Sequence, residues 1–150
     1  MGEVPLADDP GSRPDYDPGF RPAYAAFSFG APHFKGMSQY GARGRARSGQ
    51  SEEQILKAYY GDVRVEHRGD IPGNINTHAG SLPLEDNYLM GIAEMPSNWD
   101  DNNLAALKAQ AIAARSYALA YIGWRTNGGG GSKSICVTEN CQVYRSRDRK

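Results

Sequence analysis

The chain has 150 residues and a mass of 16.3 kDa, which suits one ordinary domain rather than two. Its 17 basic and 17 acidic residues cancel, and this balance excludes a general binder of nucleic acid or of anionic membranes. Apolar residues make up 39% of the sequence and charged residues 23%, so we expect a buried core. No apolar run approaches the ~18 residues of a membrane span, and the N-terminus has neither the basic nor the apolar region of a signal peptide.

The N-terminal part of the chain favours little regular structure. Residues 1–24 hold five prolines and four aspartates with almost no apolar pattern. Because proline fixes its own φ angle and disfavours helix in the residue before it, we expect an extended or disordered lead-in here. A single domain over 25–150 is expected to follow. It begins with a strand at 25–30, where Phe27 and Phe29 alternate with small residues.

Glycines shape the next segment. They stand at positions 36, 41, 44 and 49, and each lowers helix propensity by about 1 kcal/mol relative to alanine. We therefore expect a loop that leads into a closely packed, glycine-notched helix. A second helix is predicted over 51–60, because Ser51 and Gln54 can form a capping box. Alternating valines then predict a strand at 62–66, and the polar, turn-rich stretch 67–83 predicts a loop.

The second half of the chain shows the strongest helical periodicity. Apolar residues at helical spacing predict helices over 84–95 and 104–122. The second is rich in alanine, which favours a helix packed on both sides, and Asp and Asn residues precede it as candidate caps. Short strands at 135–137 and 142–144 could pair across a turn. The prediction is an α+β fold in which helices 51–60, 84–95 and 104–122 pack on short, mostly antiparallel strands.

One carboxyl group stands in apolar surroundings. Glu94 lies in the sequence IAEMP, two residues before Pro96 and five before Trp99. Apolar surroundings disfavour the charged form of a carboxyl group, and a neutral carboxylic acid can act as a general acid. A solvated glutamate at a helix end is the alternative. Glu85 and Asp86 lie roughly 12–14 Å away along a continuous helix. That is too far for the carboxyl pair of a retaining glycosidase, so chemistry at Glu94 would be that of a single acid.

The block GMSQYGA is a candidate ligand-binding loop. Ser38, Gln39 and Tyr40 place hydroxyl and amide groups on a backbone that glycines leave accessible, and His33 precedes them. Such a set suits the hydroxyl groups of a sugar. A tight glycine loop that serves packing alone is equally compatible with these residues.

Further candidates lie in the second half of the chain. Gln110 and Arg115 stand among the alanines of the long predicted helix, either as surface side chains or as groups that orient a substrate in a cleft. Cys136 and Cys141 flank a predicted turn. Two cysteines are compatible with a disulfide, with free thiols, or with a metal site that draws other ligands from distant parts of the chain. The basic tail RSRDRK is typical of a solvated chain end.

Several of these segments resemble one known family. LEDNYLMGIAEMPSNW (84–99), ALKAQAIAARSYAL (106–119) and CVTENCQVY (136–144) look like successive blocks of the sporulation stage II protein D / amidase-enhancer (SpoIID/LytB) family. GMSQYGARGRARSGQSEEQILKAYYGDV (36–63) resembles the family's glycine-rich GHGxGMSQxGA block and the helix after it. That block usually follows the EMP block and here precedes it.

The resemblance implies an extracytoplasmic enzyme of the cell wall. The better-known members are lytic transglycosylases that cleave peptidoglycan glycan strands, especially strands stripped of stem peptides. The family's catalytic acid is the glutamate of the EMP block, which maps onto Glu94. Glu94 would protonate the glycosidic oxygen between N-acetylmuramic acid and N-acetylglucosamine. It would then act as a base toward the muramic C6 hydroxyl, which closes a 1,6-anhydro ring.

The resemblance also bears on the remaining site residues and on partners. The candidates for substrate binding are His33, Ser38, Gln39, Tyr40, Gln110 and Arg115. Some members bind zinc through cysteines and a histidine. Cys136 and Cys141 match the cysteines, but no histidine is close to them in the sequence, so we expect no cofactor. The expected partners are glycan strands. The alternative function is a non-catalytic wall-binding module or amidase enhancer that acts with a cell-wall amidase.

Overall fold

The structure, a computed structural model, describes residues 36–124 and 131–145, which belong to one compact unit. Four expectations concern residues outside this part of the chain: the lead-in at 1–24, the strand at 25–30, the position of His33 and the basic tail beyond Arg145. The described residues form helices and a two-stranded antiparallel sheet, so the fold class is α+β, as predicted. None of the described helices is both long enough and apolar enough to cross a bilayer.

Two short helices come first and pack closely against each other. α1 (Gln39–Arg47) is capped by Ser38, whose Oγ accepts a hydrogen bond from the Gly41 amide at 3.1 Å. α2 (Glu52–Tyr60) has the predicted capping box at its start. At Gly41 a side chain would clash with the hydroxyl of Tyr59, so only glycine allows this approach. The predicted helix at 51–60 and the glycine-notched helix before it are therefore confirmed.

The sheet lies where the sequence predicted a loop. Within 67–83, β1 (Asn74–Thr77) and β2 (Gly80–Pro83) form an antiparallel hairpin. Ile75 and Thr77 are buried and alternate with exposed residues, as in a strand with one buried face. The Thr77 hydroxyl donates to the first carbonyl of β2 at 2.7 Å and so fixes the turn. The prediction of a loop over this whole stretch was wrong.

The strand predicted at 62–66 does not form. Val63 packs partly against the core, whereas Val65 is 40% exposed, so the two valines do not share a buried sheet face. Within the described residues, β1 and β2 pair with each other and form a sheet of their own. The segment is therefore an irregular connection between α2 and the hairpin. The prediction of a strand was wrong because, among the described residues, the alternating valines pair with no neighbouring strand.

A π-helix follows the hairpin and is shorter than the predicted helix. η4 (Leu84–Leu89) continues directly from β2, and its helical turns end at Gly91 rather than at residue 95. Ile92 instead forms an antiparallel bridge with Tyr144, and the next amide donates to the carbonyl of Val143 at 2.9 Å. Because these backbone groups pair with the C-terminal segment, they do not extend the helix.

The long helix begins with an unusual turn. α3 (Asp101–Ile122) has left-handed backbone at Asn102, Asn103 and Leu104, with φ angles of 44°, 54° and 62°, and becomes regular from Ala105. Asparagine tolerates this conformation, whereas leucine adopts it only under strain. The predicted start at 104 therefore lies close to the start of the right-handed helix.

Asp101 fastens the start of α3 to α1. Its carboxylate accepts hydrogen bonds from Arg43 Nε at 2.7 Å and from Arg47 Nε at 2.9 Å. These hydrogen bonds, and the positive charges behind them, hold the pKa of Asp101 below its ordinary value. Asp100 occupies the cap position but makes no side-chain cap hydrogen bond. Of the acidic residues predicted as caps, Asp101 thus makes a tertiary contact instead.

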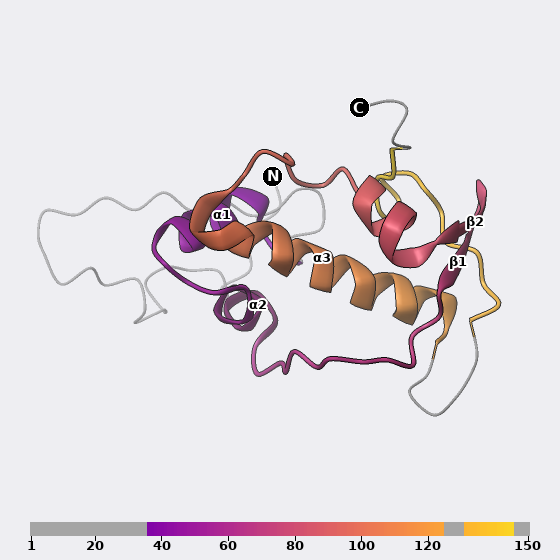
Figure 1. Ribbon diagram of the computed structural model, residues 1–150, viewed down its shortest axis with the longest axis horizontal. Helices are drawn as coiled ribbons and strands as arrows, with labels where there is room; N and C mark the ends of the chain where they lie inside the picture. Colours follow the sequence, from indigo (N-terminus) through magenta and orange to yellow (C-terminus); the bar gives the residue numbers. More distant parts are fainter. Residues whose placement is uncertain (1–35, 125–130, 146–150) are drawn as a thin grey trace, which may run out of the picture. The chain divides into compact units, whose positions relative to one another are not determined.

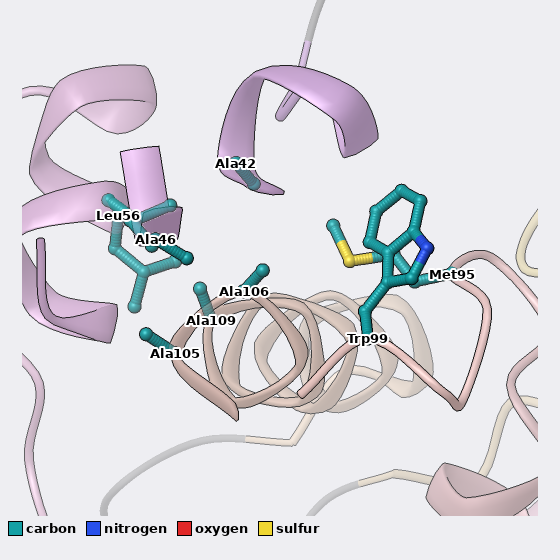
Figure 2. Packing of buried hydrophobic residues seen from close by; sticks show 9 residues of the cluster. Ala42, Ala46, Leu56, Met95, Trp99, Ala105, Ala106 and Ala109 are labelled. Atoms are coloured by element: carbon teal, nitrogen blue, oxygen red, sulfur yellow. The ribbon is translucent and has the colours of Figure 1, made fainter. Parts of the chain in front are cut away.

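The first buried cluster surrounds the N-terminal half of α3. At about 100° per residue, Ala105, Ala106 and Ala109 lie on one side of this helix. Figure 2 shows these alanines projecting from α3 toward the residues of α1 and α2, with Met95 and Trp99 beside them. The first cluster consists of Ala42, Ala46, Ile55, Leu56, Met95, Trp99, Ala105, Ala106 and Ala109.

The second buried cluster uses a largely opposite side of α3, near its C-terminal end. There Ala118, Leu119 and Ile122 pack against the hairpin and η4, and in Figure 1 the hairpin accordingly lies beside the C-terminal end of α3. The expectation of a central helix packed on both sides is therefore confirmed. The second cluster consists of Ile75, Leu84, Tyr88, Ala118, Leu119, Ile122 and Ile135.

The C-terminal segment connects the hairpin to the chain that follows η4. The segments predicted to pair as strands, 135–137 and 142–144, instead form single bridges with β1 and with Ile92. They remain joined to each other by one backbone hydrogen bond of 3.3 Å and by a disulfide across the predicted turn. This segment therefore reaches the region just before α3, where Glu94 lies.

Candidate active site

A cavity of about 590 Å³ lies where α1, η4 and the middle of α3 meet the chain between η4 and α3. The side that α3 contributes is narrow: Leu107, Gln110, Ala111 and Ala114 fall within about 100° of one another around the helix. Most of the lining is apolar. The polar residues on it are Gln39, Glu94, Ser97, Gln110 and Arg145.

Glu94 is held on this lining by the C-terminal segment. Its side chain is half-buried, and its Oε1 accepts a hydrogen bond from the Val143 amide at 3.0 Å. The Ala93 amide donates in turn to the Val143 carbonyl at 2.9 Å. Ala93 and Glu94 are thus both hydrogen-bonded to Val143, and these bonds fix the carboxyl group of Glu94 beside the cavity. The alternative of a freely solvated glutamate at a helix end does not describe this position.

The structure places two of the predicted binding residues on the lining of the cavity that contains Glu94. Gln39, the first residue of α1, and Gln110, in the middle of α3, line the same cavity. Both carry amides that can donate and accept hydrogen bonds. The two residues are 71 positions apart in the sequence. They lie on the same cavity because the N-terminal half of α3 packs on α1.

The other predicted binding residues in the described chain are engaged elsewhere. Ser38 caps α1. Tyr40 is 75% exposed and tilts against Trp99, with 5.3 Å between ring centroids. Arg115 donates to Glu85 from both Nε and Nη2, the first bond measuring 2.7 Å. None of the three lies on the cavity lining.

Glu85 cannot easily supply a second catalytic carboxyl group. Its paired hydrogen bonds with the Arg115 guanidinium hold the pKa of Glu85 below its ordinary range, so it is an ionised, occupied partner. It also lies off the cavity. Of the described residues on the lining, only Glu94 carries a carboxyl group, which agrees with the single-acid chemistry expected from the sequence.

Arg145 lines the cavity although the sequence interpretation treated the basic tail as a solvated end. Its amide donates to the Gly91 carbonyl at 2.8 Å, which brings the start of the tail back to the end of η4. The position of Arg145 directly after the CQVY block could have indicated that it lies near the site. The basic residues that follow it favoured the interpretation as a solvated chain end instead.

A comparison with models of protein families identifies the family of this chain. The family described as SpoIID, Stage II sporulation protein, matches residues 74–150. The chain belongs to the SpoIID family. The matched part begins at β1 and contains Glu94, α3 and both cysteines, whereas the glycine-rich segment at 36–63 precedes it. No curated protein and no solved structure matches the chain. SpoIID membership indicates a sporulation function related to the cell wall.

The cysteines of this SpoIID-family chain do not fit a zinc site. Cys136 and Cys141 are joined in a disulfide, so neither sulfur is a thiolate available to a metal. Across residues 36–124 and 131–145, no group of three or more His, Cys, Asp or Glu side chains is placed to hold a metal ion. The alternatives left open by the sequence thus resolve here to the disulfide, a bond typical of oxidising compartments.

Proposed function

We propose that this protein is an extracytoplasmic lytic transglycosylase that cleaves peptidoglycan glycan strands, preferring strands without stem peptides, with Glu94 as its catalytic residue. The position of Glu94 carries the proposal. It is the one carboxyl group among the described residues of the cavity lining, and the Val143 amide holds its Oε1 at 3.0 Å. The resemblance of the EMP block to the family's catalytic motif supports the same assignment.

The reaction uses one carboxyl group twice. As an acid, Glu94 donates its proton to the oxygen that links C1 of N-acetylmuramic acid to the next sugar. The C1–O bond breaks, and the departing sugar keeps the proton as a hydroxyl group. As a base, the carboxylate then takes the proton of the muramic C6 hydroxyl while O6 bonds to C1. The acid is regenerated, the product ends in a 1,6-anhydro ring, and no water is consumed.

The composition of the lining suits this route better than hydrolysis. A retaining glycosidase needs a second carboxyl group at about 5–5.5 Å as nucleophile. Here the substrate's own C6 hydroxyl takes that role, so Glu94 suffices. The amides of Gln39 and Gln110 can hydrogen-bond sugar hydroxyl and acetamido groups. The cavity volume of about 590 Å³ falls within the range of roughly 300–1,000 Å³ that is typical of ligand sites.

The test replaces Glu94 with its isostere. Purified glycan strands without stem peptides are incubated with the parent protein and with Glu94→Gln, and anhydromuramyl ends are quantified by mass spectrometry. We expect the parent to form them and the variant to form them about 10²–10⁴-fold more slowly, because an amide cannot donate and recover the proton. Glu139→Gln, an exposed carboxyl group off the lining, should retain the parent rate.

The result that contradicts the proposal is equally specific. If the folded parent forms no anhydromuramyl ends but binds glycan or raises the rate of a cell-wall amidase, the protein is a binding module or amidase enhancer. Binding by Glu94→Gln should match binding by the parent. A loss of both binding and activity would mean that the substitution damages the cavity rather than the chemistry.

A further inference from the structure

Arg145 differs from the other described arginines because its side chain has no partner among the residues that the structure describes. The others each contact a carboxylate or an amide oxygen: Arg43 and Arg47 contact Asp101, Arg45 contacts Gln50, Arg64 contacts Glu66, Arg68 contacts Asp70 and Arg115 contacts Glu85. Arg145 is exposed, and within residues 36–124 and 131–145 its guanidinium group is engaged in no ion pair or hydrogen bond. It lies on the lining of the cavity that holds Glu94.

The backbone of Arg145 has a defined position. Its amide donates to the Gly91 carbonyl at 2.8 Å. Gly91 is buried, and a side chain there would clash with the ring of Tyr144, so the chain passes in direct contact with the end of η4. Tyr144 also stacks on the buried Tyr88, with 5.9 Å between ring centroids and an interplanar angle of 10°. Arg145 is therefore presented to the cavity from a packed position.

The charge distribution of the lining defines what this cation can bind. Glu94 is the one acidic residue among the described lining residues, and it forms no ion pair with Arg145. Arginine binds planar anions such as carboxylates through two parallel N–H donors. A substrate that carries its own carboxylate would supply the partner that residues 36–124 and 131–145 do not supply. Under the proposed function, such a group exists: the lactyl carboxylate on the ring of muramic acid. It is free on a strand without stem peptides and is an amide on a strand that carries them.

We infer that Arg145 binds the free lactyl carboxylate of muramic acid and thereby selects glycan strands without stem peptides. This inference rests on the proposed function for its substrate. It assigns the selection to one side chain, separate from the carboxyl group that carries out the chemistry. An amide at the same position on the substrate offers no negative charge, so peptide-bearing strands lose the interaction.

The experiment compares three substrates: strands without stem peptides, the same strands with methyl-esterified carboxyl groups, and peptide-bearing strands. For the parent, we expect kcat/KM on the free acid to exceed that on the ester by about 10-fold or more. Arg145→Gln should lower kcat/KM on the free acid by the same factor, mainly through KM, and should treat acid and ester alike. Arg145→Lys should recover part of the preference. Arg64→Gln, which removes an equal charge from an 85% exposed side chain, should behave as the parent.

A binding measurement separates this inference from the proposed function. In the Glu94→Gln background, affinity for free-acid and esterified strands is measured with and without Arg145→Gln. We expect the preference for the free acid to be present with Arg145 and absent without it. Equal affinity for acid and ester with Arg145 present would overturn the inference, even if the parent cleaves glycan. A clear preference in a protein that cleaves nothing would uphold Arg145 and reject the catalytic proposal.

Discussion

Tyr88 is fully buried, and its hydroxyl donates to Oε1 of the buried Gln142 at 2.9 Å. Burial raises the pKa of Tyr88, so the hydroxyl stays protonated and remains a donor. We expect Tyr88→Phe to lower the free energy of unfolding by about 1–3 kcal/mol, because it leaves the Gln142 amide oxygen buried without its partner. Urea denaturation measures this change. Tyr121→Phe, on a partly exposed ring, is the control and should have little effect, and equal stability of both variants would show that the hydrogen bond contributes nothing.

Single residues of the site could be predicted from the sequence where a local pattern or a motif marks them. Glu94 could be singled out because an acidic residue in an apolar sequence is unusual. Gln39 stands in a glycine-rich block that suits sugar hydroxyls, and Gln110 is a polar residue among alanines. Arg115 could not be assigned from the sequence, because its partner Glu85 lies 30 residues away and only the fold brings the two together. Arg145 was missed for the same reason: the contact with Gly91 that turns it toward the cavity is long-range.

At the scale of elements, a disulfide closes part of the C-terminal segment. Cys136 and Cys141 close a short loop just before Val143, whose amide holds Glu94. We expect the double substitution Cys136→Ser/Cys141→Ser to lower the free energy of unfolding by about 2 kcal/mol, from loop-closure entropy. Hydrogen exchange at the Val143 amide should become faster. Reductant should reproduce both effects in the parent and leave the variant unchanged, and unaltered exchange at Val143 would contradict the proposed support.

The elements that could be predicted are those with strong local signals. The capping box of α2 and the alanine-rich run of α3 both gave helices at the expected positions. The hairpin was not predicted, because its turn lacks the Asn-Gly or Asp-Gly pair that marks such turns and is closed by the Thr77 side chain instead. The end of η4 was misplaced because Ile92 and Ala93 pair with a segment about 50 residues later, which no local pattern reveals.

At the scale of the whole described unit, both buried clusters share α3. We therefore expect one cooperative unfolding transition. Ile55→Ala in the first cluster and Ile75→Ala in the second should each lower its free energy by about 2–5 kcal/mol, since both side chains are fully buried. Far-UV and near-UV circular dichroism should give coincident melting curves in every case. Two separate transitions, with each variant moving only one, would show that the clusters fold independently.

The α+β class could be predicted from the sequence because a fold class depends only on which helices and strands form. The cavity could not be predicted, because its position depends on which faces of α3 are covered by other elements. An extra residue inserted between Ala109 and Ala118 would rotate the rest of the helix by about 100° and advance it by 1.5 Å. The residues that α3 contributes to one cluster could then keep their contacts only if those it contributes to the other cluster lost theirs. The insertion would also move Gln110 or Ala114 away from the cavity lining. The number of residues between Ala109 and Ala118 therefore fixes how the two buried clusters are oriented relative to each other.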